Sequence, residues 1–184
     1  MSAYDDRPWL ALYGDQPADY ALEFDDALSM FRAGVARDPS AVALRYFDGA
    51  ITRGELDELS DALAAGLLAN GFAAGDRLAV YLQNVPQFVI AMVATWKAGG
   101  VMVSINPMSR ERELSYLLKD SGATVLVALE ALHEQIGRSV VPSWRCRLMP
   151  ANSRSSLRLW NSSSLVVRTS RTSVSGRTSR PIWS

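Results

Sequence analysis

Residues 77–129 read RLAVYLQNVPQFVIAMVATWKAGGVMVSINPMSRERELSYLLKDSGATVLVAL. Three runs in this stretch, at 77–82, 101–105 and 124–129, have the length and the near-continuous apolar character of buried strands. The two segments between them have the length of helices. A strand–helix–strand order with connections of this length favours right-handed parallel crossovers. The sequence therefore predicts an α/β fold whose parallel sheet carries helices on both faces.

Polar residues mark where these helices are expected to begin. Asn84, with Gln87 three residues later, is predicted to cap the first helix, and Ser109 is predicted to cap the second. Gly99-Gly100 is expected to end the first helix. A further short helix is expected at 131–136, after the last strand of the sheet.

A β-hairpin is predicted on the N-terminal side of the sheet. Asp25-Asp26 is expected to open a helix, because acidic residues suit the positive end of a helix dipole. Strands are expected at 41–47 and 50–51. Asp48-Gly49 between them is a two-residue turn signal, because both residue types tolerate positive φ. The hairpin is therefore expected to precede the parallel sheet.

A capping box follows the hairpin. In Thr52-x-x-Glu55 the hydroxyl and the carboxylate are each expected to bind a backbone N–H that the first helical turn leaves unpaired. The helix behind it is expected to end at Asn70-Gly71, a left-handed stop. Its buried face is predicted to consist of Leu56, Leu59, Leu63 and Leu67.

Charge divides the chain near residue 142. All 19 acidic residues lie in 1–142, which hold 11 Lys and Arg, so this part has a net charge of −8. The last 42 residues, 143–184, contain no Asp, Glu or Lys but 8 Arg and 12 Ser, so their net charge is +8. We therefore expect an irregular leader at 1–24, a folded domain at 25–140, and an Arg/Ser-rich tail at 143–184.

Composition excludes several classes of protein. The single cysteine, Cys146, allows no disulfide within the chain, so a reducing, cytoplasmic location is expected. The acidic N-terminus is not followed by the apolar region of a secretory signal. The longest apolar run, 85–98, is shorter than the roughly 20 residues that span a bilayer. His133 is the only histidine and is expected on a helix surface, so no clustered His/Cys metal site is predicted.

Recognisable catalytic motifs are missing from the sequence. It contains no GxxxxGK[ST] loop, no GxGxxG after a strand and no GxSxG elbow. Asp57, Glu58 and Asp61 are interpreted as one solvated helix face, and Lys97 and Lys119 as cations that suit helix C-termini. Parallel sheets bind ligands beyond the carboxyl ends of their strands. Any ligand is therefore expected near Gln83-Asn84, near Asn106-Pro107 and after Leu129.

Six short segments, in order and with compatible spacing, carry a resemblance to a known family. They are Thr52-x-x-Glu55-Leu56, Gly71-x-x-x-Gly75-Asp76-Arg77, Asn84, Lys97-Ala98-Gly99-Gly100, Asn106-Pro107 and Glu113-Leu114. Together they resemble the N-terminal region of adenylate-forming (AMP-binding) enzymes, the group of acyl-CoA synthetases, luciferases and peptide-synthetase adenylation domains. The pattern is most similar to medium- or long-chain fatty-acid–CoA ligases, and it covers about residues 20–140.

The resemblance implies an ATP-dependent ligase fold of which this chain is an incomplete fragment. Such enzymes use ATP and Mg²⁺ to convert a carboxylate into an acyl-adenylate, and then transfer the acyl group to coenzyme A. The family's glycine-rich phosphate loop, ribose-binding Asp and catalytic Lys lie downstream of the matching region. No catalytic, cofactor-binding or metal-binding residue is therefore assigned in this chain, and it is expected to be inactive. Asn106-Pro107 is interpreted as a turn rather than as the border of an acyl or CoA channel.

Three interpretations of the tail remain open. It is a basic segment that binds nucleic acid, an ordinary linker, or the product of a shifted reading frame. The third is favoured, because the composition changes where the resemblance ends and out-of-frame GC-rich DNA is rich in Arg and Ser codons. The alternative function is a non-catalytic α/β interaction module whose tail binds nucleic acid. A sheet separated from its partner layers would also expose apolar faces, which predicts marginal stability and self-association.

Overall fold

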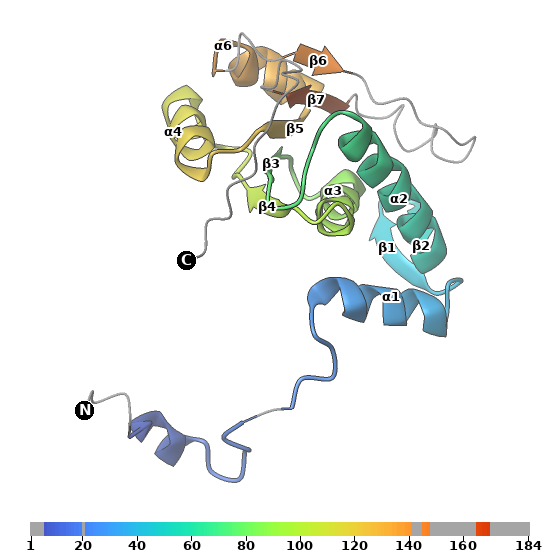
Figure 1. Cartoon of the computed structure of the whole chain (residues 1–184), viewed down its shortest axis with the longest axis vertical. Helices are drawn as coiled ribbons and strands as arrows, with labels where there is room; N and C mark the ends of the chain where they lie inside the picture. Colours follow the sequence, from blue (N-terminus) through green and yellow to red (C-terminus); the bar gives the residue numbers. More distant parts are fainter. Residues whose placement is uncertain (1–5, 20, 141–144, 148–164, 170–184) are drawn as a thin grey trace.

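The structure, a computed structural model, describes residues 6–19, 21–140, 145–147 and 165–169 (Figure 1). The order of elements confirms the α/β class. In chain order the elements are η1 (Pro8–Leu12), α1 (Ala27–Arg37), β1 (Val42–Tyr46), β2 (Gly49–Thr52), α2 (Arg53–Ala69), β3 (Arg77–Tyr81), α3 (Pro86–Lys97), β4 (Val101–Ser104), α4 (Glu111–Ser121), β5 (Val125–Leu129), α5 (Glu130–Leu132), the π-helical turn η2 (His133–Gly137), α6 (Arg138–Val140), β6 (Arg145–Arg147) and β7 (Leu165–Thr169).

The central sheet confirms the predicted parallel strands. β3 lies between β4 and β5 and runs parallel to both, so that Ala79 pairs with Val103 on one side and with Leu126 on the other. Two antiparallel strands, β7 and β6, extend the sheet beyond β5 in the order β4-β3-β5-β7-β6. The sheet is therefore mixed, where the sequence predicted only parallel strands.

Both added strands come from the Arg/Ser-rich tail. Residues 145–147 and 165–169 pair with the sheet, and the division of the chain into a leader, a domain and a tail remains a prediction. The other residues of 143–184 lie outside the described residues.

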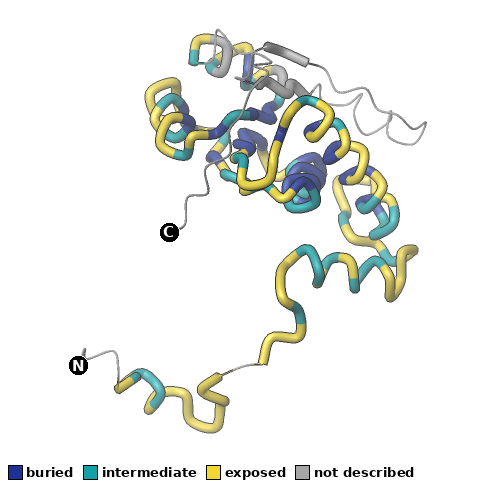
Figure 2. The backbone as a smooth tube through the Cα atoms, viewed as in Figure 1, coloured by how far each residue is buried: buried dark blue, intermediate teal, exposed yellow. Residues whose placement is uncertain are grey.

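Helices cover both faces of the three parallel strands. Alternate residues of β3 point to opposite sides: Leu78 and Val80 pack with α2 and α3, while Ala79 and Tyr81 pack with α4 and the segment at 132–140. All four are fully buried, and Figure 2 shows this buried centre between the helices. The prediction of apolar sheet faces in water is therefore wrong for these strands, because local helices already cover them.

The hairpin is confirmed, but its turn is one residue earlier than predicted. β1 and β2 are antiparallel, and Tyr46 pairs with Gly49, so that Phe47 and Asp48 form the connection. Phe47 has the positive φ, 51°, that the sequence assigned to Asp48-Gly49. The register of the strands, set by the pairing of Leu44 with the buried Ile51, overrides the local turn preference.

Both ends of α2 are as predicted. The Glu55 carboxylate accepts a hydrogen bond from the Thr52 backbone N–H at 2.8 Å, and the Thr52 hydroxyl accepts one from the Glu55 N–H at 3.2 Å. Gly71 adopts φ 83° after the last turn, and the Phe72 N–H donates to the Leu67 carbonyl, which completes a Schellman stop. The predicted leucine face, Leu56, Leu59, Leu63 and Leu67, is buried.

The capping prediction for the first helix is also confirmed. The Asp26 carboxylate accepts a hydrogen bond from the Ser29 backbone N–H at 2.6 Å and so caps α1. This bond lowers the pKa of Asp26. α1 contacts α2 and α3 through its half-buried face, which includes Phe31. The helix is therefore an outer layer that joins the leader to the domain.

Candidate functional site

The three segments predicted to border a ligand meet at one edge of the sheet. Because β3, β4 and β5 are parallel neighbours, their carboxyl ends lie together, with Tyr81 opposite Ala128 and Val80 opposite Ser104. Gln83-Asn84 follows β3, Asn106-Pro107 follows β4, and α5 follows β5 directly. The structure thus confirms that these segments share an edge, and ligand binding at this edge remains a prediction.

Asn106-Pro107 forms a turn held by local hydrogen bonds. The Asn106 side-chain oxygen accepts a bond from the Met108 N–H at 2.9 Å, and its carbonyl accepts one from the Ser109 N–H at 2.9 Å. The Ile105 N–H donates to the Val80 carbonyl at 2.9 Å and continues the pairing of the strands. These contacts occupy Asn106 in shaping the chain, as the sequence interpretation of a turn proposed.

Tyr81 is a residue at this edge that the sequence did not single out. Its ring is fully buried, and its hydroxyl donates a hydrogen bond to the Ser109 carbonyl at 2.7 Å. Burial raises the pKa of Tyr81, an effect that the nearby Arg110 charge partly opposes. Tyr81 therefore holds the start of α4 against the end of β3. Its place on an apolar strand gave no signal of this role.

Two predicted helix caps are each wrong by one residue. The α3 helix has Val85 as its N-cap residue and Pro86 at its first position, without a side-chain cap from Asn84. Proline suits this position because its fixed φ is already helical. In α4 the N-cap residue is Arg110, whose N–H donates to the Glu113 carboxylate at 3.1 Å.

The interpretation of Asp57, Glu58 and Asp61 as one solvated face holds for the exposed Glu58 and needs correction at Asp57 and Asp61. The Lys97 ammonium lies 2.6 Å from the Asp57 carboxylate and 2.6 Å from the Asp61 carboxylate. It also donates to the Asp57 carbonyl at 2.8 Å and lies 5.6 Å from the centre of the Phe31 ring. The Lys97 side chain is only 6% exposed. The sequence missed this cluster because its members lie about 40 residues apart.

The geometry of this Lys97 cluster indicates a structural role. Lys97 is the last residue of α3, and its ammonium connects that helix to α2 and to the ring from α1. Because the ammonium already binds two carboxylates and a carbonyl, it has little remaining capacity to bind a substrate. The cluster thus fixes three helices against one another.

His133 is buried, 3% exposed, and so the predicted surface position is wrong. It lies at the start of the π-helical turn η2. Within the described part of the chain no group of three or more His, Cys, Asp and Glu side chains is arranged to hold a metal. No helix among the described residues is long and apolar enough to cross a membrane.

The surface of the described residues includes the following two hollows. One, about 450 Å³, lies between α4 and α6 and is lined by Glu111, Arg112, Ser115, Ser139 and Val140. The other, the hairpin hollow, is about 220 Å³ and lies between β1 and the start of α3. It is lined by Leu44, Arg45, Tyr46, Asn84, Val85, Pro86, Phe88 and Val89. Neither brings together an acid, a base and a nucleophile, so neither has the composition of a catalytic pocket.

Comparison with known families identifies the family to which this chain belongs. The model of the family described as AMP-binding enzyme matches residues 31–163, which is more than half of the chain. The chain belongs to the AMP-binding enzyme family. The match begins in α1 and includes the hairpin, the parallel sheet and all the helices that cover it. The match also extends beyond residue 142, after which the chain has no acidic residue.

Relatives and solved structures agree with this assignment. Over 129 residues the chain is 38% identical to a long-chain-fatty-acid–CoA ligase of Bacillus subtilis, a match that covers 68% of this chain and 23% of the relative. The N-terminal subdomain of NpsA from Klebsiella oxytoca is similar at 35% identity with a TM-score of 0.55, covering 57% of this chain and 28% of that one.

A third similarity is to O-succinylbenzoate coenzyme A synthetase (MenE) from Bacillus subtilis, at 28% identity with a TM-score of 0.54, covering 57% of this chain and 24% of that chain. The chain therefore spans about a quarter of the length of each of these three proteins. The matched part contains the parallel sheet and the helices that cover it. Asn and Gln side chains follow the ends of its strands.

Proposed function

We propose that this chain forms the N-terminal framework of an ATP-dependent fatty-acid–CoA ligase and does not catalyse the reaction alone. The observation that supports this is the 38% identity over 129 residues to a long-chain-fatty-acid–CoA ligase, of which the chain covers 23%. A complete ligase would join a carboxylate to the AMP part of ATP, with loss of pyrophosphate, and then to the thiol of coenzyme A. Fatty acid, ATP and coenzyme A are thus the proposed substrates, Mg²⁺ the proposed metal, and the cytoplasm the proposed location.

The described residues do not fit the triphosphate that this reaction needs. Their sheet edge carries the neutral amides of Gln83, Asn84 and Asn106, and Asn106 is engaged in its own turn. A triphosphate with Mg²⁺ needs a loop of backbone N–H groups, a cation and a metal-binding side chain. We therefore derive no chemical step through ATP, Mg²⁺ or coenzyme A at this edge, and propose that it supports neighbouring segments that bind them.

The test is pyrophosphate release by the purified chain. The assay contains ATP, Mg²⁺, coenzyme A and a long-chain fatty acid, with a heat-denatured sample as background and the Bacillus subtilis relative as positive control. We expect the chain to release no more pyrophosphate than the denatured sample. Turnover that depends on the fatty acid would contradict the proposal, because it would require a phosphate-binding site in this chain.

We further propose that the Arg/Ser-rich composition of 143–184 reflects a shifted reading frame. The supporting observation is the change in charge from −8 before Ser143 to +8 after it. Since the family match continues to 163, the position of the shift is not fixed by the composition alone. Translating the gene in its other two frames tests this. A continuing family-like sequence with a Thr-Ser-Gly-rich loop is expected, and stop codons in both frames would refute it.

A further inference from the structure

The two outer strands of the parallel part of the sheet differ in burial. β4 is only partly buried, since Val101 is 52% exposed and Ser104 is also exposed. β5, on the other side of β3, is buried along most of its length, and Leu126, Val127 and Ala128 are fully buried. Water can serve as the partner of the outer backbone groups of β4, whereas those of β5 need a partner from protein.

The direction of the backbone groups on β5 follows from one hydrogen bond at its start. The Thr124 N–H donates to the Arg77 carbonyl of β3 at 3.0 Å. Successive residues of a strand direct their N–H and C=O groups to opposite neighbours. The even-numbered residues of β5 therefore face β3, and the odd-numbered ones, Val125, Val127 and Leu129, face the opposite edge. We call this edge, with these three residues, the outer edge of β5.

β7 pairs with the outer edge along the whole of β5, and Figure 1 shows the two strands side by side. Val127 pairs with Val167 at the centre, and Leu129 pairs with Leu165 at one end. Because Val127 faces this edge, the Val127–Val167 pair is one in which the two residues exchange both of their hydrogen bonds. β7 thus supplies the partner that the buried backbone of β5 needs.

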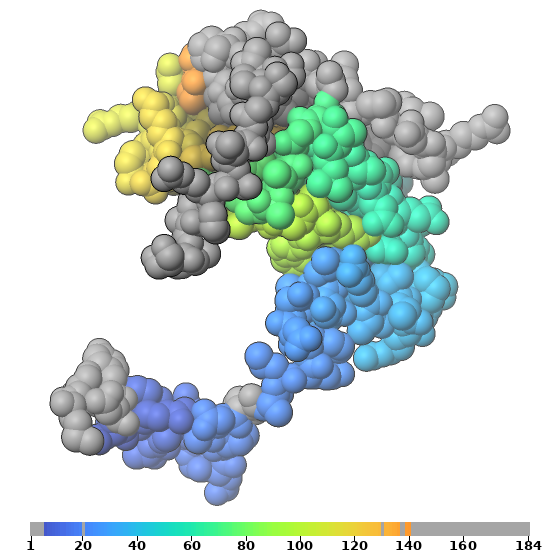
Figure 3. All heavy atoms as spheres, viewed as in Figure 1, coloured from blue at the N-terminus to red at the C-terminus, as the bar shows by residue number. Residues whose placement is uncertain are grey.

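This cover comes from the tail. The family match ends at residue 163, and β7 begins at Leu165. Among the described residues, β6 pairs with β7 and not with β5. The described leader, 6–19, stands apart from the domain (Figure 3) and so does not reach the sheet. The matched framework therefore ends in an edge that a segment outside the match covers.

We propose that the outer edge of β5 is a strand-binding site, which the chain fills with its own residues 165–169 and which a separate peptide of the same sequence can fill. Recognition rests on main-chain hydrogen bonds, as in other cases where an extended peptide adds a strand to the edge of a sheet. The outer edge carries neither a charge nor a proline, two features that prevent unwanted pairing at exposed edges. The tail thus has a role that neither a linker nor a nucleic-acid-binding segment requires.

Two proline variants of the full chain test the pairing within the chain. Val167→Pro removes the N–H that faces Val127. Val166→Pro is the matched control, because its N–H faces away from β5 and lies beyond the end of β6, which pairs as far as Val167. Amide hydrogen exchange is measured by NMR, at a concentration at which sedimentation shows a monomer.

We expect the amides of the outer edge to exchange at least tenfold faster in Val167→Pro than in wild type. The even-numbered amides of β5 should stay protected, because they bind β3. All amides of β5 should exchange within about twofold of wild type in Val166→Pro, because no bond to β5 is removed.

A fluorescein-labelled peptide of residues 163–171 tests binding from outside the chain. Its fluorescence anisotropy should show at least tenfold tighter binding to Val167→Pro than to wild type, in which β7 occupies the site. An excess of the unlabelled peptide should restore slow exchange at the outer edge. A control peptide that carries the Val167→Pro substitution should bind neither protein.

Four outcomes would overturn the proposal. They are unchanged exchange at the outer edge in Val167→Pro, equal acceleration in Val166→Pro, equal binding of the peptide to Val167→Pro and wild type, and faster exchange at the even-numbered amides as well. The last would show that β7 is required for the whole sheet and is not an exchangeable cover. None of these measurements involves ATP or a fatty acid, so the result does not depend on whether the ligase proposal is correct.

Discussion

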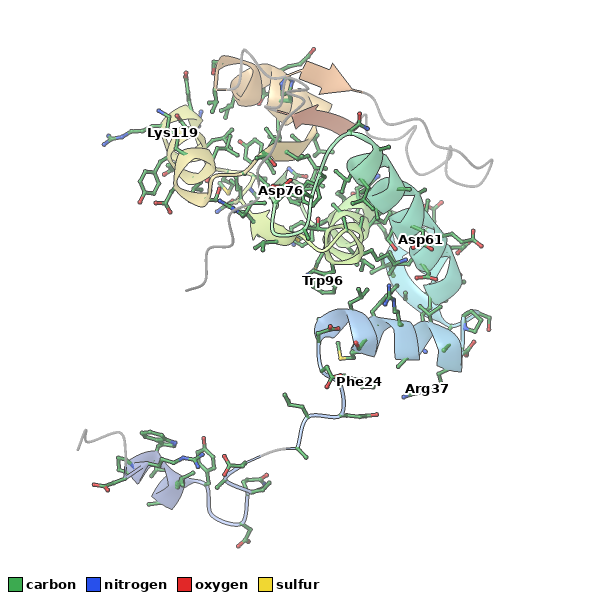
Figure 4. The ribbon with its side chains drawn as sticks, in the orientation of Figure 1. Phe24, Arg37, Asp61, Asp76, Trp96 and Lys119 are labelled. Carbon is green, nitrogen blue, oxygen red and sulfur yellow. The ribbon has the colours of Figure 1, made fainter. Side chains whose placement is uncertain are left out.

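Replacing Lys97 with Met should destabilise the domain by disconnecting α2 from α3. Methionine keeps most of the length and apolar volume of the lysine stem but removes the ammonium. The Asp57 and Asp61 carboxylates then lose a partner that is 2.6 Å from each of them. Figure 4 marks Asp61 on α2 and the neighbouring Trp96 on α3. The variant therefore tests whether this ion pair cluster contributes to stability.

The expected cost follows from how exposed the two carboxylates are. Asp57 is 33% exposed, so its charged hydrogen bond should contribute near the lower limit of about 1.5 kcal/mol for such bonds. Asp61 is 66% exposed and regains water when Lys97 is lost, so its contribution should be about 0.5 kcal/mol. We expect a loss of about 2 kcal/mol in the free energy of unfolding, since the Phe31 contact adds only a small term. The melting temperature should fall by about 5 °C.

Urea unfolding followed by tryptophan fluorescence measures this loss. The matched control is Lys119→Met, because Lys119 is also in the last turn of its helix but is exposed and forms no ion pair with another described residue. Its effect should stay within about 0.5 kcal/mol. Equal stability of Lys97→Met and wild type, or equal losses in both variants, would refute the assignment of a structural role to the cluster.

Three further predictions concern single side chains. Tyr81→Phe should cost about 1 kcal/mol in urea unfolding, because a buried carbonyl loses its donor. Since the pKa of Tyr81 is raised in the folded chain, stability should fall as the pH rises above about 10, and less so in Tyr81→Phe. The backbone N–H of Ser29 lowers the pKa of Asp26, and the Ser40 hydroxyl lowers the pKa of Asp38. Both carboxylates therefore stabilise the fold above their unfolded pKa, so the free energy of unfolding should fall below about pH 4. This fall should be less steep in Asp26→Asn. Thr52→Ala should cost about 1 kcal/mol by thermal unfolding, and an unchanged melting temperature would contradict the Glu55 capping box.

The family could be predicted because its segments are local. The capping box, the helix stop at Gly71 and the turn after β4 each consist of residues close together in the chain, and their order carries the resemblance. The strands were predictable for the same reason, since β3 and β5 are short apolar runs that each follow a glycine-containing turn. The parallel arrangement followed from the length of the helices between them.

Contacts between distant residues could not be predicted. Lys97 looked like a cation at a helix end, and Asp57 and Asp61 looked like a solvated face, until folding placed α2 beside α3. The burial of His133 and the bond from Tyr81 to the Ser109 carbonyl likewise depend on how the helices cover the sheet. The hairpin turn shifted by one residue because strand register prevailed over the turn preference of Asp48-Gly49.

The sequence by itself determined the α/β class, the α2 caps, the parallel strands and the family resemblance, because each depends on a period or a signal within a few residues. Only the tertiary structure decided the ion pair at Lys97, the burial of His133, and the antiparallel strands β6 and β7. These features depend on contacts between residues that are far apart in the sequence. Local helix and strand propensities are compatible with several tertiary arrangements, and side-chain packing selects one of them.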